Sequence, residues 1–98
     1  MAYNLVFSIE AEEDAKSAIF YYDQIHPDLR ERFFNELLKI YDKLSTAPQY
    51  YSYITTVRKS EIRDVQMPSF PYVVIFSIIK NEVYIIAVRN TRRIPLFS

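Results

Sequence analysis

Two apolar segments in the second half of the chain constrain its fold more than any other feature. They read YVVIFSII at 72–79 and VYIIAV at 83–88, and Lys80-Asn81-Glu82 joins them. Successive residues of a strand point to opposite faces, so both segments would be apolar on two sides. Strands of this kind lie at the centre of a sheet that is covered on both faces. The pattern predicts a central β-hairpin over 72–88.

Strict alternation along the second strand of this hairpin predicts which side chains share a face. Val83, Ile85 and Ala87 would face one way, and Tyr84, Ile86 and Val88 the other. Two helices can cover one face, but the rest of a 98-residue chain is too short to cover the second face fully. We expect that second face to curl over itself or to be covered by a partner protein.

The first half of the chain has helical periodicity between a short strand and a proline. The alternation in YNLVFSI predicts a first strand over 3–9, and apolar residues at three- and four-residue spacing predict helices over 11–25 and 28–45. One or two further strands are expected between 53 and 67. The prediction is a single α+β domain over 1–98 with the order β-α-α-β-β-β. An antiparallel helix hairpin would pack on a twisted, mostly antiparallel four-stranded sheet.

The composition excludes several kinds of chemistry. The chain has no Cys, no Gly and a single His, so thiolate chemistry, Gly-rich phosphate loops and most metal sites are not expected. We predict neither a metal nor a cofactor, and we predict a helix-capping or exposed role for His26. The acidic residues at 10–14 suit the first turn of a helix. Without Gly, Asn81 and Asn90 are the expected positive-φ residues.

No apolar run is long enough to cross a membrane, and the N-terminal residues do not resemble a signal peptide, so we expect a cytoplasmic protein. The net charge is zero, but residues 1–51 carry a balance of −4 and residues 52–98 a balance of +4. Arginine suits phosphate and carboxylate ligands, so the basic half is the expected binding surface. The alternative is a set of rim charges that pair with Glu61 or Asp64. The candidate binding residues are Arg58, Arg63, Tyr72, Arg89, Asn90, Arg92 and Arg93; no catalytic residue is assigned.

Three segments, in this order of elements, resemble the RelE/ParE superfamily of bacterial toxins. RFFNELLKIYDKLSTAPQYY is similar to the second helix of that family and the proline after it, and FPYVVIFSI to its Phe-Pro-Tyr strand. AVRNTRRIP is similar to its closing signature. The resemblance implies a RelE/ParE-like fold and the toxin of a type II toxin–antitoxin pair, a plasmid-stabilisation type of protein. An antitoxin partner is implied, and a second copy of the chain is a further candidate partner.

The resemblance implies two different targets. ParE-like members inhibit DNA gyrase without being enzymes, whereas RelE-like members cleave mRNA on the ribosome. This chain has Val73 and Asn90 where the nucleases usually carry Arg and His, and it ends in Leu96-Phe97-Ser98 rather than with a catalytic Tyr. The residues therefore favour a gyrase inhibitor that is not an enzyme. An mRNA endonuclease and a degenerate toxin that binds only its antitoxin remain the alternatives.

Overall fold

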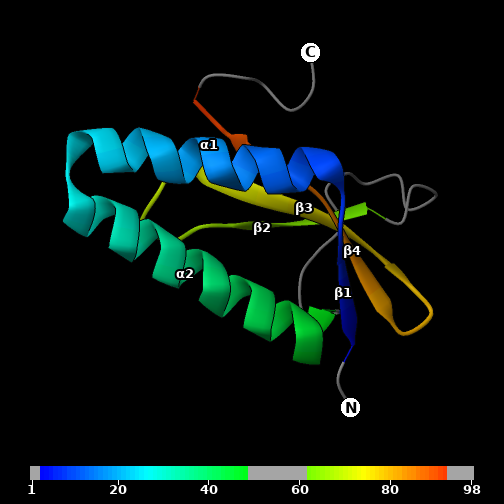
Figure 1. The fold of residues 1–98 in the computed structure, drawn as a ribbon. Coiled ribbons are helices and arrows are strands. Elements are labelled where there is room, and N and C mark those ends of the chain that lie inside the picture. Colours follow the sequence, from blue (N-terminus) through cyan, green and yellow to red (C-terminus); the bar gives the residue numbers. More distant parts are fainter. Residues whose placement is uncertain (1–2, 49–61, 93–98) are drawn as a thin grey trace.

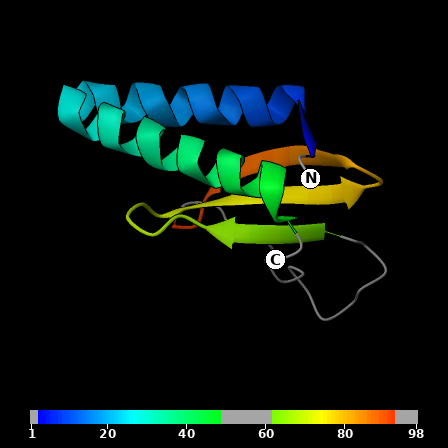
Figure 2. The same ribbon diagram turned by 90° about the horizontal axis from the view of Figure 1, so that it is seen from below.

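The computed structural model describes residues 3–48 and 62–92 of the chain. Its elements are β1 (Asn4–Phe7), α1 (Ile9–Ile25), α2 (Pro27–Thr46), β2 (Ile62–Gln66), β3 (Tyr72–Ile79) and β4 (Glu82–Asn90). Both helices lie on the same side of the sheet (Figures 1 and 2). The predicted order and the helix hairpin are confirmed. The segment YITTVRK, where a further strand was expected, lies outside the described residues.

The four strands form one sheet in the order β1-β4-β3-β2. β3 pairs antiparallel with both β2 and β4, while β1 runs parallel to β4. The hairpin of β3 and β4 therefore lies at the centre, as its two apolar faces predict. None of the helices in the described part of the chain is long and apolar enough to span a bilayer.

Side-chain caps fix where both helices begin. The Ser8 Oγ accepts a hydrogen bond from the Ala11 N–H, so α1 begins at Ile9 and not at residue 11. Ile9 was expected to end the first strand, but it is the first helical residue and 73% exposed. Pro27 begins α2, and the Nδ1 of His26 accepts a hydrogen bond from the Asp28 N–H at 3.1 Å. The expected capping role of His26 is confirmed.

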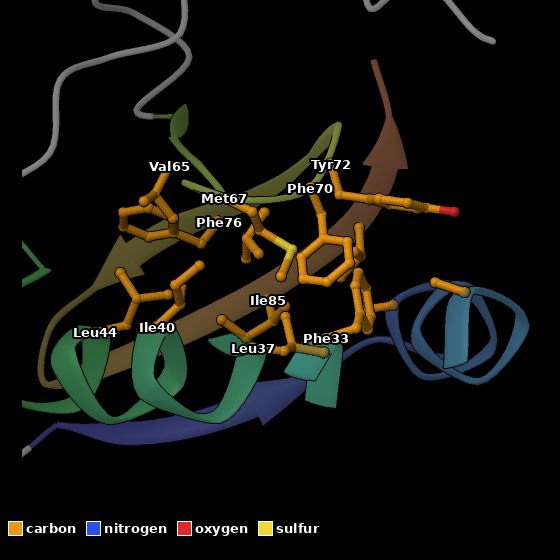
Figure 3. Close-up of a cluster of buried hydrophobic side chains, with 14 of the residues drawn as sticks. Phe33, Leu37, Ile40, Leu44, Val65, Met67, Phe70, Tyr72, Phe76 and Ile85 are labelled. Atoms are coloured by element: carbon orange, nitrogen blue, oxygen red, sulfur yellow. The ribbon is translucent and has the colours of Figure 1, made fainter. Parts of the chain in front are cut away.

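The core lies between α2 and the inner face of the sheet (Figure 3). α2 contributes a buried stripe at helical spacing: Phe33, Leu37, Ile40 and Leu44. The strands contribute Val65, Val74, Phe76, Val83 and Ile85 to the same cluster. This is the packing that the two sequence periodicities predict together.

A bulge in β4 overturns the strict alternation that the sequence predicted. Ile75 pairs with Ala87 and Phe76 pairs with Ile85, so Ile86 has no partner in β3. Ile86 is 36% exposed, and Val88 rejoins Val83 and Ile85 in the core under the helices. Ala87 is buried outside that cluster. The extra residue thus changes the face of every side chain that follows it.

A second correction concerns the backbone of the turns. Among the described residues, Lys80 has the positive φ, at 57°, whereas Asn81 and Asn90 were expected to adopt it. Lys80 and Asn81 form a two-residue loop closed by the pair Ile79 and Glu82. The first position of this loop needs the left-handed conformation, and an exposed unbranched lysine can adopt it at modest cost.

Candidate partner-binding site

A pocket of about 210 Å³ lies between α1 and the C-terminal part of β4. Three predicted binding residues, Tyr72, Arg89 and Asn90, line this pocket. Asp14, Ser17, Ala18, Tyr21 and Val88 complete it. The pocket therefore joins residues of the first helix to residues that are more than fifty positions later in the sequence.

The short length of β1 leaves room for this pocket. β1 ends at Phe7, opposite Ile85, while β4 continues to Asn90. The Ser8 N–H donates to the Ile85 carbonyl and the Ser8 hydroxyl donates to the Ile86 carbonyl at 2.7 Å. Beyond this point α1 follows the outer edge of β4 in place of a strand.

Asp14 attaches α1 to this edge. Its Oδ2 accepts a hydrogen bond from the Val88 N–H at 3.1 Å. An unpaired backbone N–H at a partly buried strand edge would be costly, so this contact stabilises the edge of the sheet. The sequence suggested only a helix-dipole role for Asp14, and the structure adds a contact across 74 positions.

The pairing of β3 with β4 brings the predicted residues together. Tyr72 lies opposite Asn90, and Val73 lies opposite Arg89. The Tyr72 side chain is only 7% exposed, and its ring packs edge-on against Phe33 with centroids 5.2 Å apart. Its hydroxyl points away from the core side chains (Figure 3). Tyr72 is one of the residues that line the pocket, and its backbone carbonyl accepts a hydrogen bond from the Gln66 side chain at 3.3 Å.

Arg89 lines two neighbouring hollows of this edge. Besides the first pocket, it borders a second of about 380 Å³ near the end of β1, where Phe7, Glu10, Tyr84 and Ile86 are among the lining residues. In the part of the chain that the structure describes, no carboxylate forms an ion pair with its guanidinium. Its forked N–H donors are therefore open to an anionic partner.

The residues after β4 form a tight turn that positions Arg92. The Asn90 Oδ1 accepts a hydrogen bond from the Arg92 N–H at 2.9 Å, and the Thr91 N–H donates to the Pro71 carbonyl at 2.9 Å. Arg92 is exposed beside the β2–β3 connection. Burial raises the pKa of Tyr22. The neighbouring Tyr72 and Tyr21 raise this pKa further, while the positive charge of Arg92 lowers it. Arg92 thus lies close to the aromatic cluster behind the pocket.

Arg63 does not join this group. It lies in β2 opposite Phe76, whereas Gln66 is the β2 residue opposite Val73. Of the two carboxylates expected as alternative partners of the arginines, Asp64 forms none of the ion pairs in the described part of the chain, and Glu61 lies outside the described residues. Burial raises the pKa of Asp64. Arg58 and Arg93, the two remaining predicted arginines, lie outside the described residues.

Sequence reasoning missed the helical wall of the pocket. Asp14, Ser17 and Tyr21 are spaced three and four residues apart, so they share one face of α1. That spacing was visible in the sequence, but the apolar stripe of the same helix was the stronger signal. The lining of the pocket supplies hydroxyls, an amide and aromatic surface, and the Oδ2 of its one carboxylate is bonded to the Val88 N–H. These groups suit binding of a polar ligand.

The fold is that of known toxins of both RelE and ParE type. The chromosomal ParDE TA system from P. aeruginosa contains a similar chain, with a TM-score of 0.75 and 15% identity over 91% of this chain and 96% of that one. The isolated E. coli RelE toxin has a TM-score of 0.56 and 17% identity, over 98% and 92%. A chain of the intact E. coli RelBE toxin-antitoxin complex has a TM-score of 0.53 and 16% identity, over 89% of this chain and 94% of that one. At these identities the likeness concerns the fold alone.

The family follows from the sequence match. Residues 5–95 match the family described as ParE toxin of type II toxin-antitoxin system, parDE. No curated protein sequence is similar enough to count as a match. The chain belongs to the ParE toxin family of type II toxin–antitoxin systems.

Proposed function

We propose that this chain is a toxin that acts by binding a protein, that its target is DNA gyrase, and that a cognate antitoxin neutralises it. The match to the ParE toxin family over 5–95 supports the toxin role. Both gyrase and an antitoxin would be met in the bacterial cytoplasm, which is where we expect the protein to act.

The chemistry of the pocket is the observation that carries the choice of a binding mechanism. Cleavage of RNA by its 2′-hydroxyl needs a positioned base in addition to cations. The single His of the chain caps α2, and the Oδ2 of Asp14 is bonded to the Val88 N–H. The pocket offers Arg89 and two tyrosines, which are good anchors for a protein partner.

Exposed apolar side chains also favour a protein partner. On the helices these include Phe20 at 64% exposure, Phe34 and Leu38, and on the outer face of the sheet Ile79 and Ile86. Large exposed apolar residues near polar ones are typical of protein-binding surfaces. We expect antitoxin and target to bind through some of these residues.

The target can be tested with two purified systems. The protein is added to gyrase with relaxed plasmid DNA, and separately to ribosomes that translate a defined mRNA. We expect supercoiling to be inhibited while the mRNA stays intact. Cleavage of the mRNA at the ribosomal A site would replace the gyrase proposal with the endonuclease alternative. No effect in either system, with antitoxin binding retained, would identify a degenerate toxin.

The antitoxin can be tested through the neighbouring gene. The structures similar to this chain include the ParDE system and the RelBE toxin-antitoxin complex, in which a toxin is paired with a second protein. We expect the adjoining reading frame to encode a small protein that co-purifies with this chain and restores growth. A neighbour that neither binds nor restores growth would contradict the proposal.

A further inference from the structure

We propose that the outer edge of β1 pairs with β1 of a second copy of this chain, so that two four-stranded sheets become one continuous sheet. The sheet order is β1-β4-β3-β2, and in the described part of the chain β1 pairs with β4 alone. One side of β1 is therefore an edge. This inference does not depend on the toxin role, because it rests on the groups in and beside β1.

The backbone of β1 has unused hydrogen-bonding groups on its outer side. In a parallel pair, alternate residues direct both their N–H and their C=O to the neighbouring strand. The N–H groups of Asn4 and Ser8 each donate to a carbonyl in or beside β4 at 3.0 Å, so the even-numbered residues face β4. The N–H and C=O groups of Leu5 and Phe7 therefore point away from β4, and no described residue pairs with them. Such a row of groups is a template for a further strand.

The residues of β1 do not protect this edge. Native edge strands commonly carry a charge, a proline or a bulge that prevents pairing with another chain. β1 reads NLVF, without a charge or a proline, and the bulge of this sheet lies in β4. Phe7 is 38% exposed, and Ile9 beyond the end of the strand is 73% exposed. The edge is thus open to association.

The sequence of β1 is complementary to itself in an antiparallel pair. A two-fold axis at Val6 would place Leu5 of each copy opposite Phe7 of the other, and Val6 opposite its own copy. Leu5 and Phe7 lie on the helix side of the sheet and Val6 on the outer side, so each pair joins apolar side chains on one face. The two pairs of Leu5 with Phe7 would use all the unpaired backbone groups of both strands.

The charges at the two ends of β1 favour a second copy over an unrelated strand. The Tyr3 N–H donates to the Ser45 carbonyl, which holds the end of α2 beside the start of β1, while α1 begins just after β1. Antiparallel pairing would bring the end of α2 in one copy toward the start of α1 in the other. The first turn of α1 carries Glu10 and Glu12, and the last turn of α2 carries Lys43. Two-fold symmetry repeats this attraction on both sides of the axis.

The first experiment changes the charge at the proposed two-fold axis and measures association by analytical ultracentrifugation. A strand of four residues forms a small interface, so we expect a wild-type dimer that dissociates on dilution. Val6→Lys and Val6→Glu should each be monomeric, because like charges would face one another across the axis. An equimolar mixture of the two should associate at least about fivefold more tightly than either variant alone.

The control is Ile79→Lys, which places a charge on an exposed apolar residue away from β1 and should leave the dimer unchanged. Recovery in the mixture also shows that both Val6 variants are folded. A wild-type chain that stays monomeric at every concentration would overturn the proposal. A mixture that associates no better than the single variants would overturn it too.

The second experiment needs no substitution and follows amide hydrogen exchange in dilute and concentrated wild-type protein. The N–H groups of Leu5 and Phe7 should exchange at least about tenfold more slowly in the concentrated sample, because only the dimer occupies them. The Val6 N–H faces β4 and should be protected in both samples. Protection of Leu5 and Phe7 that appears only when the adjoining gene product is added would overturn self-association and assign the edge to that protein.

Discussion

Lys80 shows how a chain without glycine forms its tightest described turn. Its φ of 57° lies in the left-handed region, which costs an L-residue about 1–2 kcal/mol. The loop that Lys80 forms with Asn81 has only two residues, so changes at other loop positions cannot relieve this strain. The side chain is exposed and therefore contributes little packing to offset this cost.

Replacing Lys80 by glycine should stabilise the protein. The glycine removes the backbone strain of the left-handed conformation, and this gain exceeds the cost of the extra conformational entropy that glycine gives the unfolded chain. We therefore expect the free energy of unfolding to rise by about 0.5–1 kcal/mol. The matched control is Asn81→Gly, which should destabilise because Asn81 does not have a positive φ. Urea denaturation of both variants measures the difference. Equal shifts of the two midpoints would show that the loop is not strained at Lys80.

Local chemistry could be predicted for single residues where the partner is close in sequence. His26 is followed by Pro27 at a helix start, so its capping role could be inferred from the sequence. The bond between Asp14 and Val88 depends on how α1 passes the edge of β4, and no local pattern reveals it. The positive φ was assigned to Asn81 and Asn90 from intrinsic preference, whereas the loop geometry placed it at Lys80.

At the scale of elements, the spacing of apolar residues predicted the helices and strands but not the register in which the strands pair. The helices, the central hairpin and the core face of α2 follow from the spacing of apolar residues. The bulge at Ile86 does not, because an apolar residue on either face of β4 gives the same sequence pattern. The register of the two strands had to be known before Val88 could be assigned to the core face.

The packing of α2 on the sheet can be tested with two adjacent leucines. Leu37 is 2% exposed within the core, and Leu38 is 45% exposed on the same helix. Leu37→Ala should lower the free energy of unfolding by roughly 2–5 kcal/mol, because it removes buried methyl groups and leaves a cavity. Leu38→Ala keeps helix propensity and should cost under about 1 kcal/mol. Chemical denaturation of both variants distinguishes them; a larger loss for Leu38→Ala would contradict this orientation of α2.

At the scale of the whole molecule, the basic second half of the chain supplies one wall of the site and the acidic first half supplies the other. The sequence predicted the contribution of Tyr72, Arg89 and Asn90, because they end the central strands. It could not predict that Asp14 and Tyr21 face them, since that depends on the short β1 and the path of α1. Arg63 was expected in the same group, and the order of the strands places it at the opposite edge.

The arginines after β4 should contribute to partner binding through charge-assisted contacts and through long-range attraction. Arg92 is exposed next to the rigid end of β4, and Arg93 follows it in the sequence. We expect Arg92→Ala and Arg93→Ala each to weaken antitoxin or target binding by about 1–3 kcal/mol, the range for losing a charge-assisted contact. Folding should change by less than about 1 kcal/mol for Arg92→Ala, because exposed charges contribute little to stability.

The salt dependence of partner binding distinguishes an electrostatic role of Arg92 and Arg93 from a structural role. Exposed charges are screened beyond about 10 Å at 0.1 M ionic strength, so the difference between wild type and each variant should shrink as salt is added. Lys39→Ala is the matched control, since it removes an exposed charge from the far side of α2 and should leave affinity and its salt dependence unchanged. Association rates measured from low to high salt provide the readout, because steering by surface charge acts mainly on the rate of encounter. Arginine variants that bind as tightly as wild type at low salt would limit recognition to the pocket of Arg89 and Tyr72.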